Sequence, residues 1–192
     1  MQVPEFREFP KIARLNRECY ITEKIDGTNA CVVVAEDGGV WAQSRNRLLA
    51  HETDPFGSAL WVERNKDVLR DVLGHGYHFG EWWGSGIQRR YGLEGADKRF
   101  SLFNVERWKD VPFPQGVGTV PLLYQGLFTT AAVEDALARL RSEGSLAAPG
   151  FMRPEGVVIY HVAANAGFKV TLERDEERKG ARVAPTPGEG AR

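Results

Sequence analysis

Cysteine is scarce in this sequence: Cys19 and Cys31 are the only two in 192 residues, and they do not form a Cys-x-x-Cys pair. Two separate thiols imply neither a disulfide framework nor a zinc site, and we interpret them as small buried side chains in a reducing cytosol. Long hydrophobic runs are also missing, and residues 1–5 lack the pattern of a signal peptide. We therefore expect a cytoplasmic protein that makes no contact with a membrane.

An excess of basic residues is missing too, because 25 lysines and arginines stand against 26 aspartates and glutamates, for a net charge of −1. The chain thus has no overall electrostatic signature of nucleic-acid binding, and such binding would need local clusters of lysine and arginine. The rest of the composition is ordinary for a globular protein, with 42% hydrophobic and 27% charged residues. The length suits one sizeable core and is too short for two.

One short motif, Lys24-Ile25-Asp26-Gly27, lies at the end of a run that is typical of a β-strand. Side chains alternate along a strand, so we expect Lys24 and Asp26 on one face and Ile25 on the other, in the core. A lysine amine is a nucleophile only in its neutral form, which low polarity or neighbouring cations favour. The motif predicts a reactive lysine at the rim of a cleft, although alone it is equally typical of a solvated surface turn.

The segment that follows is predicted to be a β-hairpin. A valine-rich run at 30–35 leads into an Asp-Gly-Gly turn, and the run 40–45 returns as its partner strand. Together with the strand that carries Lys24, we expect these runs to form an antiparallel meander. Such a meander would bring Arg45 and Arg47 near the sheet of the lysine.

Two helices are predicted from capping residues and hydrophobic spacing. The first starts after the Asp54-Pro55 pair and ends at Gly74 or Gly76. The second starts at Thr129 and ends at Gly144. Their polar residues are interpreted as solvated faces.

The stretch Gly76–Gly84 reads as a strand with one carboxylate, Glu81, among four aromatic residues. Paired tryptophans are most often core residues. A carboxylate in apolar surroundings is costly, however, unless it meets a cation or a hydroxyl group. We therefore expect a functional role for Glu81. The loop 85–98, with Arg89 and Arg90, is either a solvated connection or a phosphate-contacting loop.

Further strands are predicted in the second half of the chain. Residues 100–108 alternate as a strand, in which Phe103 lies on the face opposite Phe100. Residues 111–118 form a loop rich in proline and glycine, and 120–124 form a short strand. 

A second hairpin is predicted from residues 154–162 and 168–172, with a turn between them. Glu155 lies at its entry, and Lys169 lies early on the returning strand. This hairpin supplies a second carboxylate and a second lysine to any site that Lys24 belongs to.

The two ends of the chain are expected to differ from its middle. Residues 1–19 are predicted to be an irregular lead-in that packs against the first strands. We expect a single domain over 1–183, and a disordered tail over 184–192, where proline and glycine dominate.

Taken in order, these motifs resemble those of the covalent nucleotidyltransferase superfamily of polynucleotide ligases and mRNA capping enzymes, most closely the ATP-dependent RNA ligase family. The motifs are Lys-x-Asp-Gly at 24–27, Gly-Glu at 80–81, the aromatic strand at 100–105, Glu-Gly-Val-Val at 155–158 and the lysine at 169. The resemblance covers about residues 20–175. It implies an α+β, ATP-grasp-like nucleotidyltransferase domain of antiparallel sheets flanked by helices, with the nucleotide in the cleft between the sheets.

The resemblance implies that Lys24 is the nucleophile. It would attack the α-phosphate of ATP, release pyrophosphate and form a lysyl-AMP intermediate, with Asp26 and Gly27 completing the same motif. The AMP would pass to an RNA 5′-phosphate, and a 3′-hydroxyl would then displace AMP and join the ends. The expected partners are therefore RNA ends, with no obligate protein partner.

The resemblance also assigns nucleotide contacts. Glu23 would contact the adenine amine, and Phe103 would stack on the adenine. Glu81 would hold the ribose. Arg45 would contact phosphates of the nucleotide or of the RNA end.

The remaining assignments concern the metal ion and the phosphates. Glu155 would bind Mg²⁺ or Mn²⁺, because such hard cations prefer the oxygen atoms of a carboxylate. Lys169 would contact the α-phosphate. Many relatives carry a second lysine two residues later, where this chain has Thr171; either Thr171 takes that place or Lys179 compensates. 

Because the chain ends soon after this motif, we expect no OB-fold or other C-terminal domain. This argues against a duplex-DNA ligase and against a capping enzyme. Two alternatives stay open. One is a self-adenylylating enzyme with another acceptor, and the other is a non-catalytic RNA- or nucleotide-binding module that retained the fold.

Overall fold

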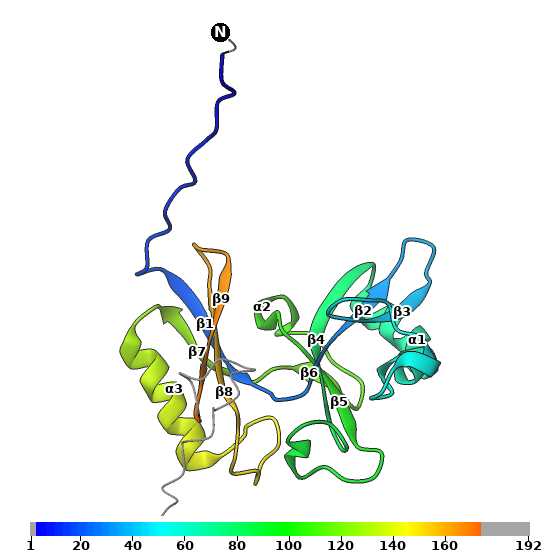
Figure 1. The fold of residues 1–192 in the computed structure, drawn as a ribbon. Helices are drawn as coiled ribbons and strands as arrows, with labels where there is room; N and C mark the ends of the chain where they lie inside the picture. Colours follow the sequence, from blue (N-terminus) through cyan, green and yellow to red (C-terminus); the bar gives the residue numbers. More distant parts are fainter. Residues whose placement is uncertain (1–2, 174–192) are drawn as a thin grey trace, which may run out of the picture.

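The computed structural model describes residues 3–173, which form two β-sheets with a helix on the outer side of each (Figure 1). The first sheet has the strand order β7-β1-β8-β9 and is antiparallel throughout. The second sheet has the order β3-β2-β4-β5-β6 and is antiparallel except for the parallel pair β5–β6. The predicted α+β class is confirmed, and the expectation of antiparallel sheets holds with that one exception.

The first sheet gathers segments that lie far apart in the sequence. Its elements, with the helix that covers it, are β1 Glu18–Lys24, β7 Leu122–Leu127, α3 Thr130–Glu143, β8 Gly156–His161 and β9 Ala166–Thr171. Ile21, Ile159 and Leu140 belong to the core between this sheet and α3. Because side chains alternate along β1, Lys24 faces away from α3, toward the second sheet.

The second sheet and α1 enclose another, larger core, so the expectation of one core is wrong: each sheet buries its own apolar face against its own helix. The elements of this half are β2 Thr28–Val34, β3 Val40–Ser44, α1 Ser58–Leu73, β4 Gly76–Gly84, β5 Lys98–Leu102 and β6 Val117–Thr119. Three single-turn helices, η1 His51–Thr53, η2 Arg90–Gly92 and α2 Val105–Trp108, lie in the connections. Val32, Trp82 and Leu69 pack together between the sheet and α1. Glu81 therefore faces the first sheet, because it alternates with Trp82.

Both predicted helices are confirmed, but the first begins at Ser58 with Gly57 at its N-cap, so Asp54 and Pro55 lie before the helix and not at its cap and first turn. The Asp54 carboxylate accepts hydrogen bonds from the backbone nitrogens of Phe56 and Ala59 at 2.9 and 2.6 Å, which satisfies donors at the start of α1. α1 ends at Gly74, whose φ of 67° suits glycine. Thr129 caps α3 by accepting from the Ala132 nitrogen, and Gly144 follows its last turn.

The predicted meander is wrong. β1 pairs with β7 and β8 in the first sheet, whereas β2 and β3 belong to the second. The chain changes sheet at residues 25–27, directly after Lys24. The hairpin of β2 and β3 is confirmed, but its partner is β4 rather than the strand of the lysine. The lysine therefore stands at the junction of the two sheets.

Residues 100–108 are only partly a strand. β5 ends at Leu102, and Asn104 starts the single turn α2 by accepting a hydrogen bond from the Arg107 nitrogen at 3.0 Å. The expected loop 111–118 contains most of β6, and the expected strand at 120–124 is β7, which starts at Leu122. The final hairpin is confirmed as β8 and β9.

Residues 3–14 of the N-terminal lead-in do not pack against the strands, whereas the carbonyl oxygens of Leu15 and Arg17 accept hydrogen bonds from His161 and Phe128. The apolar side chains from Val3 to Ile12 are exposed, and this segment runs away from both sheets (Figure 1). No helix within residues 3–173 is both long and apolar enough to cross a bilayer. The predicted tail at 184–192 lies outside the described residues.

Candidate active site

The site lies where the chain crosses between the sheets. Ile25 is buried among side chains from both halves of the molecule, which fixes the crossover. At Gly27 the backbone passes close to β4. A Cβ atom there would lie 2.5 Å from the carbonyl oxygen of Trp82 and 2.7 Å from the Cβ of Trp83. Position 27 must therefore be glycine, because its backbone lies against β4. This contact also places Lys24 beside β4.

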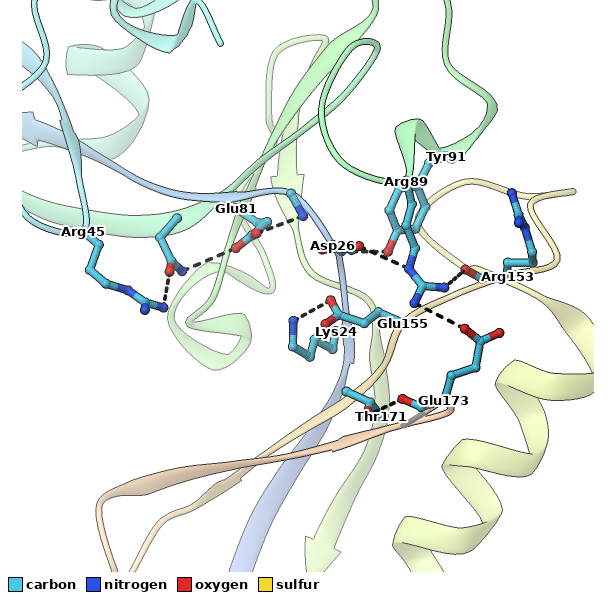
Figure 2. A network of polar contacts seen from close by, with 12 residues as sticks. Lys24, Asp26, Arg45, Glu81, Arg89, Tyr91, Arg153, Glu155, Thr171 and Glu173 are labelled. Atoms are coloured by element: carbon cyan, nitrogen blue, oxygen red, sulfur yellow. Dashed lines mark hydrogen bonds and ion pairs between the residues drawn. The ribbon is translucent and has the colours of Figure 1, made fainter. Parts of the chain in front are cut away.

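Lys24 forms an ion pair with Glu155, with 2.5 Å between Nζ and Oε2 (Figure 2). The register explains the pair: Lys24 stands opposite Gly156 in the β1–β8 ladder, so Glu155 directly precedes the partner residue. The Lys24 side chain is 19% exposed and that of Glu155 is 8% exposed. The amine is therefore held at a mostly enclosed position that a ligand can still reach.

Gly156 also has a steric reason to be glycine. A Cβ atom at this position would collide with the carbonyl oxygen of Val170 on β9. This close passage brings β9 next to the lysine, and Thr171 stands opposite Gly156 in the ladder. The Thr171 hydroxyl donates to the Glu173 carbonyl oxygen at 2.9 Å (Figure 2).

Glu81 closes the site from the second sheet. Its carboxylate accepts hydrogen bonds from the Gly27 nitrogen at 3.0 Å and from the Asn29 amide at 3.4 Å. Arg45 donates to the other end of the Asn29 amide at 2.6 Å, so these side chains form a chain of contacts (Figure 2). Burial raises the pKa of Glu81 to about 7, although the positive charge of Lys24 opposes this effect.

This pKa predicts an unusual pH dependence of stability. The unfolded Glu81 side chain releases its proton at about pH 4.5 and the folded one at about pH 7, so stability should fall as the pH rises through this window. Above pH 7, the contribution of Glu81 to the free energy of unfolding should be about 3 kcal/mol lower than it is below pH 4.5. Glu81→Gln should therefore unfold at a higher denaturant concentration than the wild type at pH 8, and at a similar concentration near pH 4.5.

Denaturant titrations at several pH values measure this difference, with the exposed Glu94→Gln as the matched control. A gap between Glu81→Gln and the wild type that is the same at pH 5 and pH 8 would contradict the assignment.

A second ionic contact fixes Asp26. Arg89 Nε lies 3.1 Å from the Asp26 carboxylate, and another nitrogen of Arg89 donates to the Arg153 carbonyl oxygen at 3.0 Å (Figure 2). The Tyr91 hydroxyl accepts from the Asp26 nitrogen at 2.7 Å. Arg89 and Tyr91, in the loop after β4, therefore hold residues 25–27 in place. Arg89 contacts Asp26 instead of standing free in solvent, and a contact of this loop with a phosphate stays a prediction.

Sequence reasoning missed Tyr91, and it left Arg89 undecided. Gln88, Arg90 and Tyr91 adopt positive φ angles of 43°, 59° and 51°, which are uncommon outside glycine. Nothing in the local sequence announces this conformation. The one available signal was a tyrosine in a loop otherwise dominated by glycine and charge.

Glu23 is directed away from the lysine. It is 1% exposed, and its carboxylate accepts from the Ser145 hydroxyl at 2.5 Å and from the Leu146 and Ala147 nitrogens at 2.8 and 3.0 Å. Burial raises the pKa of Glu23, and these hydrogen bonds oppose the rise. In this structure Glu23 anchors the loop after α3, and its predicted contact with adenine stays a prediction.

The last two predicted residues lie at the edge of the site. Lys169 lies on β9 opposite Val158, on the same face as Lys24, with β8 between their strands. Its side chain is exposed and has no ion-pair partner within residues 3–173. Phe103 follows β5, and its nitrogen donates to the Phe79 carbonyl oxygen at 3.0 Å. It lies on the face of the second sheet that carries Glu81.

The acidic side chains of this site could bind a metal ion only together with ligands that the protein does not supply. Across residues 3–173, no three acidic, histidine or cysteine side chains are grouped to hold a metal ion by themselves. Mg²⁺ commonly uses one or two carboxylates together with phosphate oxygens and water. Glu155 therefore fits as a single protein ligand of an ion that a nucleotide would bind at the same time.

The arrangement of sheets and helices is also found in solved structures of an RNA ligase. Three solved structures of mutants of the Naegleria gruberi RNA ligase show it. Two with ATP and Mn have TM-scores of 0.58 and 0.57 at 21% and 22% identity, and cover 82% and 81% of this chain. An apo mutant has a TM-score of 0.57 at 20% identity and covers 82%. They match over 50%, 49% and 50% of their own length, so this chain spans about half of that ligase.

The sequence supports the same relationship. The family model described as RNA ligase matches residues 17–172. No curated protein matches the sequence. The chain belongs to the RNA ligase family.

Proposed function

We propose that this chain is an ATP-dependent RNA ligase that joins 5′-phosphate and 3′-hydroxyl ends through a lysyl-AMP intermediate. The observation that carries the proposal is the enclosed Lys24–Glu155 pair, with Glu81 beside it at the junction of the sheets. The Naegleria gruberi structures with ATP and Mn support the choice of ATP and a divalent ion.

In the first step, Lys24 Nζ forms a bond to the α-phosphorus of ATP, and the bond to pyrophosphate breaks. The amine must lose a proton for this attack, and Glu155 Oε2 is the acceptor to which it is hydrogen-bonded. A bound Mg²⁺ or Mn²⁺ would stabilise the negative charge that gathers on the phosphate, with Glu155 as its protein ligand. Lys169 would add a positive charge on the same face.

The second sheet would hold the nucleoside. Glu81, at the centre of its hydrogen bonds with Gly27 and Asn29, would accept from a ribose hydroxyl. Phe103 would stack on the adenine, and Arg45 would contact a phosphate. The buried position of Glu81 gives a hydrogen bond made there more weight than one made in water.

The later steps return Lys24 to its starting state. An oxygen of the RNA 5′-phosphate attacks the phosphorus of lysyl-AMP, and the bond to Nζ breaks as the amine regains a proton. The 3′-hydroxyl then attacks the phosphorus of the activated 5′ end. A phosphodiester bond forms, and AMP leaves.

The proposal is tested by incubating the protein with ATP labelled in its α-phosphate and with Mg²⁺ or Mn²⁺, followed by denaturing electrophoresis. The wild type should carry the label covalently, and Lys24→Ala should carry none, because the proposal assigns the attack on the α-phosphorus to Lys24 alone and gives Lys169 only a charge contact with the phosphate. Addition of 5′-phosphorylated RNA should remove the label from the protein and yield joined RNA.

Each alternative gives a different result. ATP binding without a covalent label would indicate a non-catalytic module. A labelled protein that does not transfer AMP to RNA would indicate another acceptor. A label on Lys24→Ala would overturn the proposed nucleophile.

A further inference from the structure

The second sheet exposes four aromatic side chains on the face that carries Glu81. Trp41, Tyr77, Phe79 and Phe103 are between 42% and 61% exposed. The opposite face of the same sheet is covered by α1 and holds the buried core. Single exposed apolar residues are common, but a contiguous group on one face marks a binding surface. We call Trp41, Tyr77 and Phe79 the aromatic face; Phe103, which the proposed function assigns to the adenine, lies beside it.

The strand register shows that the aromatic face is contiguous. Tyr77, Phe79 and Glu81 are spaced by two residues on β4, so their side chains point to the same side. The rings of Tyr77 and Phe79 are 6.3 Å apart and inclined by only 17°. Val33 on β2 pairs with both Tyr77 and Trp41, which joins β3 to the group. Phe103 is connected to Phe79 through its backbone hydrogen bond.

The aromatic face begins at the candidate active site and leads away from it. Phe79 is the next outward residue on this face of β4 after Glu81. Arg45, which donates to Asn29, lies at the boundary between the two. Lys169, which has no ion-pair partner in residues 3–173, lies on the inner face of the opposite sheet. A ligand that fits both regions therefore combines flat apolar rings with negative charge.

We propose that the aromatic face binds the unpaired nucleotides of an RNA end, whose bases stack on Phe79 and Tyr77 while the terminal phosphate lies near Lys24. This inference rests on the proposed function and specifies its substrate class as single-stranded ends. Every base has a π-face that an aromatic ring can stack on, and unpaired bases are free to use it. Bases inside a duplex are already stacked on their neighbours, so a fully paired end does not fit.

The test measures binding of a short 5′-phosphorylated RNA, labelled with fluorescein at its 3′ end, by fluorescence anisotropy. Phe79→Ala and Tyr77→Ala should each weaken binding about tenfold, because one stacked base is lost. Phe79→Tyr should bind like the wild type, since it retains the ring, whereas Phe79→Leu should bind like the alanine variant. A blunt duplex of the same sequence should bind weakly and be insensitive to these substitutions.

Phe168→Ala is the matched control. Phe168 is 57% exposed, close to the 55% of Phe79, but it pairs with Ile159 on the face of the first sheet that packs against α3. It should bind RNA like the wild type. Binding that is unchanged in Phe79→Ala and Tyr77→Ala would overturn the proposal and leave the face to a protein partner. An equal loss in Phe168→Ala, or equal binding of the duplex, would also overturn it.

Formation of the covalent AMP adduct distinguishes a failure of this inference from a failure of the proposed function. Phe79→Ala and Tyr77→Ala should form the covalent AMP adduct at the rate of the wild type, because neither residue contacts Lys24 or Glu155. If they lose the adduct as well, the aromatic face belongs to the nucleotide pocket and the inference is wrong. If the wild type forms no adduct but single-stranded RNA binds as described, the proposed catalysis fails while the RNA surface stands.

Discussion

Alanine in place of Glu155 should lower the rate of self-adenylylation at least about 1000-fold. The substitution removes the group that holds the Lys24 amine, the proposed acceptor for its proton and the carboxylate proposed to hold a metal ion. These roles coincide in one side chain, so their loss should exceed the effect of removing one hydrogen bond. The rate of label incorporation from ATP measures it.

The Glu155→Gln variant tests whether the activity depends on the negative charge of Glu155 or only on the size of its side chain. The amide keeps the size of the side chain and can still contact Lys24, but it neither ligates a cation strongly nor accepts a proton. It should be almost as inactive as the alanine variant. Glu143→Ala is the matched control, because Glu143 is an exposed glutamate on α3 that pairs with Arg139. A Glu155→Gln protein with more than a tenth of the wild-type rate would show that geometry alone matters at this position.

Loss of folding is not the expected explanation for an inactive Glu155 variant. Lys24 keeps 19% of its side chain exposed, so water can solvate the ammonium group when its partner is removed. The free energy of unfolding should change by about 1 kcal/mol, which is typical of a single polar contact. A denaturant titration of Glu155→Gln checks that the fold is intact.

Local elements were predictable because their signals are local. Gly74 and Gly144 end the two long helices at the expected places, and the glycine turn between β2 and β3 forms the expected hairpin. The turn α2 was mistaken for strand because four residues are too few to distinguish the two periods. Asn104 makes this segment helical by capping α2 with its side chain, a contact that the hydrophobic pattern does not reveal.

The pairing of strands was not predictable, because it depends on residues far apart in the chain. Lys24 contacts Glu155 across 131 positions of sequence. The order of motifs indicated one site, and the structure brings Lys24, Glu81 and Glu155 together. The order of the motifs could not reveal that the chain leaves one sheet and enters the other between Lys24 and β2. Arg89 and Tyr91, which fix that crossover, lie in a backbone conformation with no sequence signal.

The crossover also predicts the effect of Gly27→Ala. The added Cβ would lie 2.5 Å from the Trp82 oxygen, 2.7 Å from the Trp83 Cβ and 3.1 Å from the Glu81 Cγ. Two of these atoms belong to the β4 backbone or are fixed to it, so they cannot rotate away, and the crossover must move. Overpacking of this kind costs about 2 kcal/mol, which a denaturant titration measures.

The same displacement should lower self-adenylylation by at least about 100-fold, because a shift of about 1 Å at a reacting group has an effect of this size. Gly27 donates its backbone hydrogen to Glu81, and Lys24 lies three residues before it, so both sides of the site move together. Gly118→Ala is the matched control: Gly118 is a strand glycine on β6 with no atom within 4 Å of an added Cβ, and both stability and activity should be unchanged. If Gly27→Ala loses stability but keeps its rate at a temperature where it is folded, the crossover does not position the lysine.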